Sequence, residues 1–209
     1  NHLGTGAVYG LYALSTNSNQ VDNNTVHTLS GGGTLYGLYF SGTNPTVYNN
    51  NVYNLTTSGT TLYGLYNSGT GTTNCYKNQV YNLTNNNASA TLYGFYITTG
   101  TSNYVYNNFV SDLKAPNSAS LTGLVGMYVS AGTSIGLYYN TIFLNATSVG
   151  ANFSASGIYA SSTPTVDMRN NIVVNSSTPT GTGLAIAYRR SSTTLTSYSA
   201  NSNNNSFYA

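Results

Sequence analysis

The chain has 209 residues with only eight charged side chains, five Lys or Arg and three Asp, and a formal net charge of +2. So small and scattered a charge excludes the basic surface of a nucleic-acid-binding protein, and no apolar run approaches the roughly 18 residues of a membrane span. Disordered chains are poor in aromatic and β-branched residues, whereas this chain contains 21 Tyr at regular positions, so we predict folded β structure.

A short motif, Leu-Tyr-Gly-Leu-Tyr at 35–39, recurs along the whole chain. An earlier copy lies at 8–12, near copies at 62–66 and 92–96, and looser copies at 124–128, 155–159 and 184–188, the last with Ile186 in place of Gly. The final Tyr of each copy follows the previous one by 27 to 32 residues: Tyr12, Tyr39, Tyr66, Tyr96, Tyr128, Tyr159 and Tyr188. A period of that length is typical of a stack of repeated units.

Each repeat carries a second frame, which reads Val-Tyr-Asn-Asn-Asn-Val at 47–52. One Asn is common to its copies: Asn24, Asn50, Asn78, Asn108, Asn140 and Asn171, with Asn204 as a candidate seventh. Three short apolar runs per repeat follow, at 35–40, 46–48 and 52–55 in the second repeat, and Ser, Gly, Thr, Asn and Pro separate them. No window has helical spacing with caps. We therefore predict an all-β chain in which each run pairs with its copy in the next repeat, giving three parallel sheets.

The combined pattern, Asn-Asn-x-Val/Ile-x-x-Leu, a polar turn and Gly-Leu/Ile-Tyr, resembles the repeat of right-handed parallel β-helix proteins from about position 7 to 175, and more weakly beyond. The resemblance implies a single-stranded solenoid of about seven coils. It also implies that the shared Asn lies in the turn between the second and third strands, with its side chain stacked on its copies. Asn tolerates left-handed backbone, and amides in register hydrogen-bond from one coil to the next. We expect 1–209 to form one solenoid domain of a longer chain, with 183–209 as a degenerate last coil.

The register predicts which side chains face the interior. Three columns are expected there: Val47, Cys75, Val105, Leu137 and Met168; Val52, Val80, Val110, Ile142 and Val173; and Leu38, Leu65, Phe95, Met127 and Ile158. A fourth column should face outward, because it holds Tyr48, Tyr76, Tyr106 and Tyr138 beside Asp22 and Arg169. The direction of Tyr12, Tyr39, Tyr66 and Tyr96 stays open. Their parity favours the outside, and their presence in every repeat favours a buried edge.

Few residues offer reaction chemistry. Asp22, Asp112 and Asp167 belong to the first, fourth and sixth coils, and coils lie about 4.8 Å apart, so none is placed to pair as the polysaccharide lyases and hydrolases with this fold require. His2 and His27 lack a Cys, Asp or Glu partner for a metal. Cys75 aligns with Val47 and Val105, which predicts a buried thiol. We expect no catalytic activity, no cofactor and no metal.

Three functions are compatible with this sequence. The preferred one is a structural segment of an extracellular stalk, fibre or adhesin, whose partners are other segments of the same chain or copies stacked end to end. The second is a carbohydrate-binding module that uses Tyr48, Tyr76, Tyr106 and Tyr138, although such ladders also stabilise neighbouring strands by packing. The third is a non-catalytic part of a polysaccharide lyase or hydrolase-like protein. Scarce charge, one Cys and abundant Asn, Thr and Tyr favour an extracellular or cell-surface location.

Overall fold

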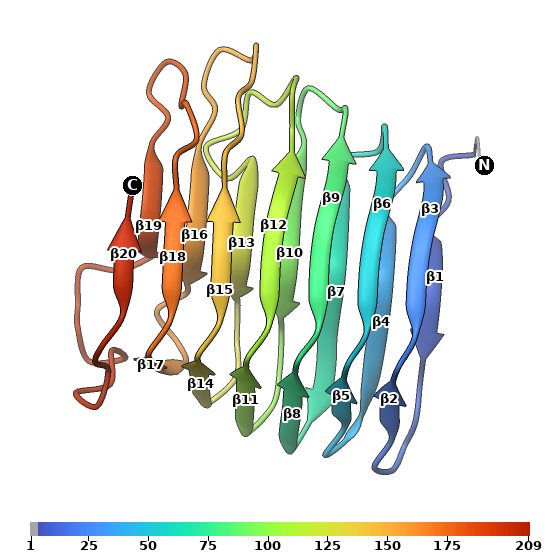
Figure 1. Ribbon diagram of the computed structural model, residues 1–209, viewed down its shortest axis with the longest axis vertical. Coiled ribbons are helices and arrows are strands. Elements are labelled where there is room, and N and C mark those ends of the chain that lie inside the picture. Colours follow the sequence, from blue (N-terminus) through green and yellow to red (C-terminus); the bar gives the residue numbers. More distant parts are fainter. Residues whose placement is uncertain (1–3) are drawn as a thin grey trace.

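The computed structural model describes residues 4–209, and in this part of the chain it contains strands and turns but no helix. The chain winds through about seven stacked coils, and every strand pairs in parallel with its copy in the neighbouring coil (Figure 1). The strands form three sheets that together enclose one core. The predicted fold class, a parallel β-helix with three parallel sheets, is confirmed.

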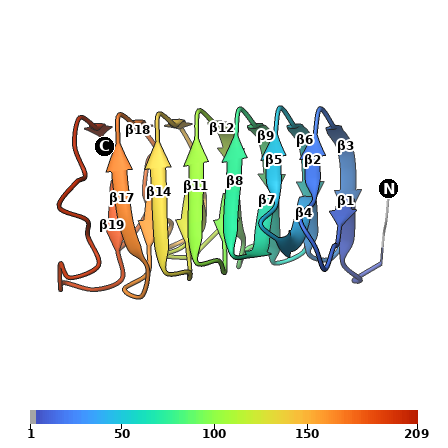
Figure 2. The same ribbon diagram turned by 90° about the horizontal axis from the view of Figure 1, so that it is seen from below.

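Strands of the three sheets follow one another in each coil. The first sheet contains β1 (Val8–Ala13), β4 (Leu35–Thr43), β7 (Thr61–Thr70), β10 (Thr91–Ile97), β13 (Leu124–Val129), β16 (Ala155–Ala160) and β19 (Ala185–Arg190). The second contains β2 (Gln20–Asp22), β5 (Thr46–Tyr48), β8 (Thr72–Tyr76), β11 (Ser102–Tyr106), β14 (Ser134–Tyr138) and β17 (Thr165–Arg169). The third contains β3 (Thr25–Gly31), β6 (Asn51–Thr57), β9 (Gln79–Asn85), β12 (Phe109–Lys114), β15 (Thr141–Leu144), β18 (Ile172–Asn175) and β20 (Ser206–Tyr208). Figure 2 shows the short strands of the second sheet side by side.

The core is built from columns of side chains that repeat from coil to coil. All three predicted inward columns are buried and in register; Cys75, for example, is paired with Val47 on one side and Val105 on the other. The structure adds inward columns that the sequence analysis did not assign: Leu35, Leu62, Leu92 and Leu124 in the first sheet, and Leu55, Leu83 and Leu113 in the third.

The repeated Gly of the first sheet interrupts the alternation of inward and outward side chains. Leu35 and Leu38 are both fully buried because Gly37 between them also faces the interior. A Cβ atom on Gly37 would lie 2.5 Å from Cγ1 of Val52 and 2.6 Å from the carbonyl oxygen of Gly64. In these coils an added Cβ would force Val52 or the neighbouring backbone to move, which explains why the motif keeps Gly at this close approach between the first and third sheets.

A ladder of buried Asn side chains connects the coils, as predicted. The backbone N–H and Nδ2 of Asn78 both donate to Oδ1 of Asn108, at 2.9 and 3.0 Å, and Nδ2 also donates to the carbonyl oxygen of Val47 at 3.0 Å. Oδ1 of Asn78 in turn accepts from the backbone N–H and Nδ2 of Asn50, at 3.0 and 2.9 Å. The side chain is fully buried, so each coil satisfies the polar atoms of the next.

The position of the left-handed turn corrects one part of the sequence interpretation. Positive φ falls on the residue before each ladder Asn, with φ between 52° and 56°: Asn23, Asn49, Lys77, Asn107, Tyr139, Asn170 and Asn204. The assignment of Asn204 to the ladder was therefore wrong, because Asn204 is the turn residue. The seventh ladder member is Asn205, whose Oδ1 accepts from the backbone N–H and Nδ2 of Asn171 at 3.1 and 2.8 Å.

The last coil is shifted by one residue relative to the sequence alignment. Tyr188 is paired with Ile158 and not with Tyr159, so it belongs to the inward column, and Arg189 takes the outward position beside Tyr159. Ala187, not Ile186, occupies the Gly position, since its carbonyl oxygen lies where that of the next Gly lies in earlier coils. The alignment on Tyr was wrong because the crowded Gly position accepts Ala but not the larger Ile.

The Asn ladder yields a stability prediction. Asn78→Ala removes five hydrogen bonds and leaves the buried backbone N–H of Asn50 without its acceptor, while Oδ1 of Asn108 keeps only the backbone N–H of residue 78 as a donor. The free energy of unfolding should therefore fall by about 3 kcal/mol. Chemical denaturation measures this change. Asn74→Ala is the matched control: it lies in the same coil, and its half-buried side chain is on the outer face. It should change stability by less than about 0.5 kcal/mol. Equal effects of the two substitutions would contradict a structural role for the ladder.

The thiol of Cys75 provides a test of the register. Its side chain is buried, Sγ accepts a hydrogen bond from Nδ2 of Asn78 at 3.4 Å, and burial raises the pKa of the thiol. A thiol reagent should therefore react slowly with the native protein at neutral pH and rapidly in denaturant. Labelling followed by mass spectrometry measures both rates. Equally fast labelling of the native chain would show that this column does not face the core.

Candidate functional site

The outer face of the second sheet carries the predicted column of Tyr side chains. The rings of Tyr48 and Tyr76 are stacked with centroids 5.0 Å apart and an interplanar angle of 4°, and those of Tyr76 and Tyr106 are 4.9 Å apart at 7°. Each stacked ring covers the face of its neighbour. Gln20 also reaches the first ring, since its Nε2 donates to the hydroxyl of Tyr48 at 2.9 Å. Both faces of the Tyr76 ring are therefore covered, whereas Tyr48 and Tyr106 each stack on one ring.

The stack ends between Tyr106 and Tyr138, although the two residues are paired in register. The ring of Tyr138 leans over Gly136, where an added Cβ would lie 2.5 Å from Cζ and from the hydroxyl oxygen of Tyr138. In the neighbouring strands the position of Gly136 is held by Tyr104 and Asp167. Because Gly136 has no side chain, the ring of Tyr138 lies in this space and leaves the ladder.

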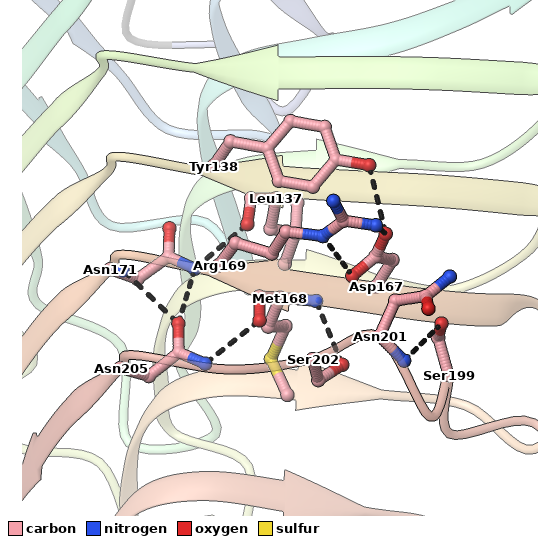
Figure 3. A network of polar contacts seen from close by, with 10 residues as sticks. All are labelled: Leu137, Tyr138, Asp167, Met168, Arg169, Asn171, Ser199, Asn201, Ser202 and Asn205. Carbon is pink, nitrogen blue, oxygen red and sulfur yellow. Dashed lines mark hydrogen bonds and ion pairs between the residues drawn. The ribbon is translucent and has the colours of Figure 1, made fainter.

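An ion pair holds Tyr138 in this leaning position. Its hydroxyl donates to Oδ2 of Asp167 at 3.1 Å, and Nε of Arg169 donates to Oδ1 of the same carboxylate at 3.0 Å (Figure 3). The guanidinium of Arg169 also lies 5.6 Å from the ring centroid of Tyr138, within the range of a cation–π contact. Burial, and then the Asp167 carboxylate, raise the pKa of the Tyr138 hydroxyl, so it remains a hydrogen-bond donor to that carboxylate at neutral pH.

A hollow of about 320 Å³ lies where the ladder opens. Its lining consists of Asn74, Tyr104, Tyr106, Asn107, Tyr138 and Tyr139. A smaller hollow of about 200 Å³ adjoins it and is lined by Tyr138, Tyr139, Arg169 and Asn170. Of the four candidate contact residues from the sequence, the structure brings Tyr106 and Tyr138 to this hollow and leaves Tyr48 and Tyr76 in the closed stack. Sequence reasoning missed Gly136, although a Gly inside a strand outside the repeated motif marks a site of close approach.

The outer face of the first sheet carries two further Tyr columns, which settles the direction of the fully repeated set. Rings of the column Tyr12, Tyr39, Tyr66, Tyr96, Tyr128 and Tyr159 are half-buried or exposed on the outer face. They pack edge to face against the column Tyr9, Tyr36, Tyr63 and Tyr93; the centroids of Tyr63 and Tyr66, for example, are 4.9 Å apart at 84°. Both columns also stack along the axis, as Tyr39 does on Tyr66 at 4.9 Å and 11°. Arg189 continues the outer column, with its guanidinium 4.7 Å from the ring centroid of Tyr159.

The three carboxylates have separate partners. Asp112 forms an ion pair with Lys114 at 2.9 Å, Asp167 is bound by Arg169 and Tyr138, and Asp22 accepts from Nε2 of Gln20 at 3.0 Å. His27 stacks on Tyr53 with ring centroids 5.2 Å apart. Residue His2 lies outside the described residues. Over 4–209, no three His, Cys, Asp or Glu side chains come together in a way that would hold a metal ion. No helix in the same range is long and apolar enough to cross a membrane.

Comparison of the chain with protein-family models, with curated proteins and with solved structures gives no match. The fold and the hollow between Tyr106 and Tyr138 are therefore the observations on which a function can be based.

The packed Tyr columns of the first sheet predict a loss of stability at high pH. Burial, followed by neighbouring Tyr rings, raises the pKa of Tyr36 and of Tyr93 from 10.0 to about 12. Between these two values the unfolded chain releases protons that the folded chain retains, so the free energy of unfolding should fall as the pH rises through this window. Denaturation at a series of pH values, with Tyr ionisation followed by absorbance, tests this. Tyr36→Phe should reduce the slope, and titration of all Tyr near 10 would contradict the burial.

Proposed function

We propose that this chain is a structural segment of an extracellular stalk, fibre or adhesin, without catalytic activity of its own. The observation that supports this most directly is the unbroken Asn ladder from Asn24 to Asn205, in which every coil makes the same bonds to the next. Such a stack behaves as a one-dimensional rod whose length grows by about 4.8 Å with every coil.

The remaining polar chemistry supports a structural role over an enzymatic one. Each of the three carboxylates is held by a side chain of its own surroundings, and two of them are neutralised by a cation. A polysaccharide-cleaving centre needs a pair of carboxylates, or a carboxylate-bound cation, facing one bond of the substrate. We therefore propose that the chain acts as a rigid rod with a contact surface, and that its carboxylates do not catalyse a reaction.

Partners and location follow from the same proposal. Among residues 4–209, the end strands β1 and β19 of the first sheet have a strand neighbour on one side only, and open strand edges favour pairing with another strand. The partner that fits such an edge is a coil of the same kind, either from the same chain or from another copy. We propose an extracellular or cell-surface setting because Asn, Thr and Tyr replace charge on this rod.

Removal of one whole coil tests the structural function. Deletion of residues 51–78 joins Asn50 to Gln79, which already holds the position of Asn51 in the next coil. If length and stiffness are the function, the shortened chain should fold cooperatively, and small-angle X-ray scattering should show a rod shorter by about 4.8 Å. Deletion of 51–64 alone is the control, because it removes the third-sheet strand β6 and joins the end of the second sheet to the middle of β7 in the first, which should abolish folding.

An activity assay on the same chain can contradict the proposal. The purified chain should release no new sugar ends from a panel of polysaccharides. Turnover that disappears in Asp22→Asn, Asp112→Asn or Asp167→Asn would make the structural proposal wrong, as would a coil deletion that unfolds the protein.

A further inference from the structure

The hollow between Tyr106 and Tyr138 is a feature that a rod does not need. A continuous stack would be the more stable arrangement, because a stacked aromatic pair stabilises the fold beyond the area that it buries. We propose that this hollow binds a ring of a neutral sugar polymer, with the open face of Tyr106 as the platform. This inference concerns a site on the rod and does not depend on the proposed structural role.

Three observations show that the opening is built into the fold. Tyr106 stacks on Tyr76 with one face, and this is its only ring contact among residues 4–209; the same residue lines the hollow. Tyr138, which would close the stack, lies over Gly136 instead. Its hydroxyl is bonded to Asp167, which Arg169 holds in place. The lack of a side chain at Gly136 therefore leaves room for the leaning ring, and the ion pair of Asp167 with Arg169 holds the Tyr138 hydroxyl there.

The lining matches the two kinds of surface of a sugar ring. The C–H groups on the face of a pyranose are weakly positive, and they pack on the negative face of an aromatic ring. The hydroxyl groups at its edge need donors and acceptors, which the amides of Asn74 and Asn107 and the hydroxyl groups of Tyr104 and Tyr139 provide around the hollow. Tyr104 and Tyr139 are exposed, at 41% and 59%, so their hydroxyl groups remain accessible to a ligand.

Charge favours a neutral ligand. No charged side chain lines the larger hollow. Arg169 lines the adjoining hollow, but its guanidinium is already paired with the Asp167 carboxylate. An anionic sugar would have to compete with that carboxylate for the same cation, whereas a neutral sugar leaves the pair intact.

The two hollows share Tyr138 and Tyr139, which favours a polymer over a single sugar. A ligand seated on Tyr106 can continue across these rings to the adjoining hollow. A peptide that adds a strand to a sheet needs an open strand edge. Here β11 is paired with β8 on one side and with β14 on the other, so its backbone offers no free edge.

The experiment is a binding measurement with labelled oligosaccharides from cellulose, mannan and galactan, with polygalacturonate and a Pro-rich peptide as the other ligand classes. At least one neutral oligosaccharide should bind the wild-type chain. Tyr106→Ala removes the platform and should weaken this binding by at least about tenfold. Gly136→Ala places a Cβ where the ring of Tyr138 lies, so the ring returns toward Tyr106 and closes the hollow, with a similar loss of affinity.

Two comparisons separate binding from folding. Gly136 does not have a left-handed φ, so Ala fits its backbone and should leave the melting temperature unchanged or raised. Tyr48→Ala is the matched control, because Tyr48 belongs to the same column and also stacks on Tyr76 but lines neither hollow. The affinity of this variant should stay within about twofold of the wild type. Binding of none of the neutral sugars would overturn the proposal. So would binding only of polygalacturonate or of the peptide, or a neutral-sugar affinity that neither Tyr106→Ala nor Gly136→Ala reduces.

Discussion

The hydrogen bonds between buried Asn side chains are the interaction on which this structure depends. Each amide is used completely: Oδ1 accepts twice from one neighbouring coil, and Nδ2 donates to an amide and to a backbone carbonyl. A shift by one residue would leave these groups buried without partners, which is costly. The ladder therefore fixes the register at one turn, and the columns of Val, Leu and Tyr stay aligned because the register is fixed there.

A Tyr ring face can stack on a neighbouring ring or bind a ligand, but the same face cannot do both. Where the rings of Tyr48, Tyr76 and Tyr106 stack, the faces in contact are covered, and the middle ring, Tyr76, has no face left for a ligand. Such rings stiffen the rod and offer no platform to a ligand. A ring face stays uncovered only where a stack ends, and Gly136 makes the stack end between Tyr106 and Tyr138. On a solenoid of this kind, a binding site is thus expected at a defect in the repeat rather than along its regular part.

The last coil shows which constraint has priority when the repeat decays. Keeping Tyr188 in the outer Tyr column would place Ile186 at the crowded position of Gly. The fold instead places Ala187 there, turns Tyr188 inward onto Phe207 and Tyr198, and lets Arg189 extend the outer column over Tyr159. The register of the last coil thus follows the space available at the Gly position and not the alignment of Tyr188 with the outer Tyr column. A clash in a packed core costs more free energy than the loss of one exposed aromatic contact.

The sequence by itself determined the architecture, because the spacing of Asn and of the Gly-x-Tyr motif repeats what each coil needs from the next. It also assigned three of the inward columns, the burial of Cys75 and six of the seven ladder Asn. The tertiary structure decided what depends on distances across the coil or between coils. It placed the left-handed turn one residue before the ladder, moved the seventh position to Asn205 and directed the repeated Tyr outward. It also reduced the four candidate contact residues to Tyr106 and Tyr138. The ring of Tyr138 leans over Gly136 because of packing between strands, and the spacing of residues along the chain does not show such packing.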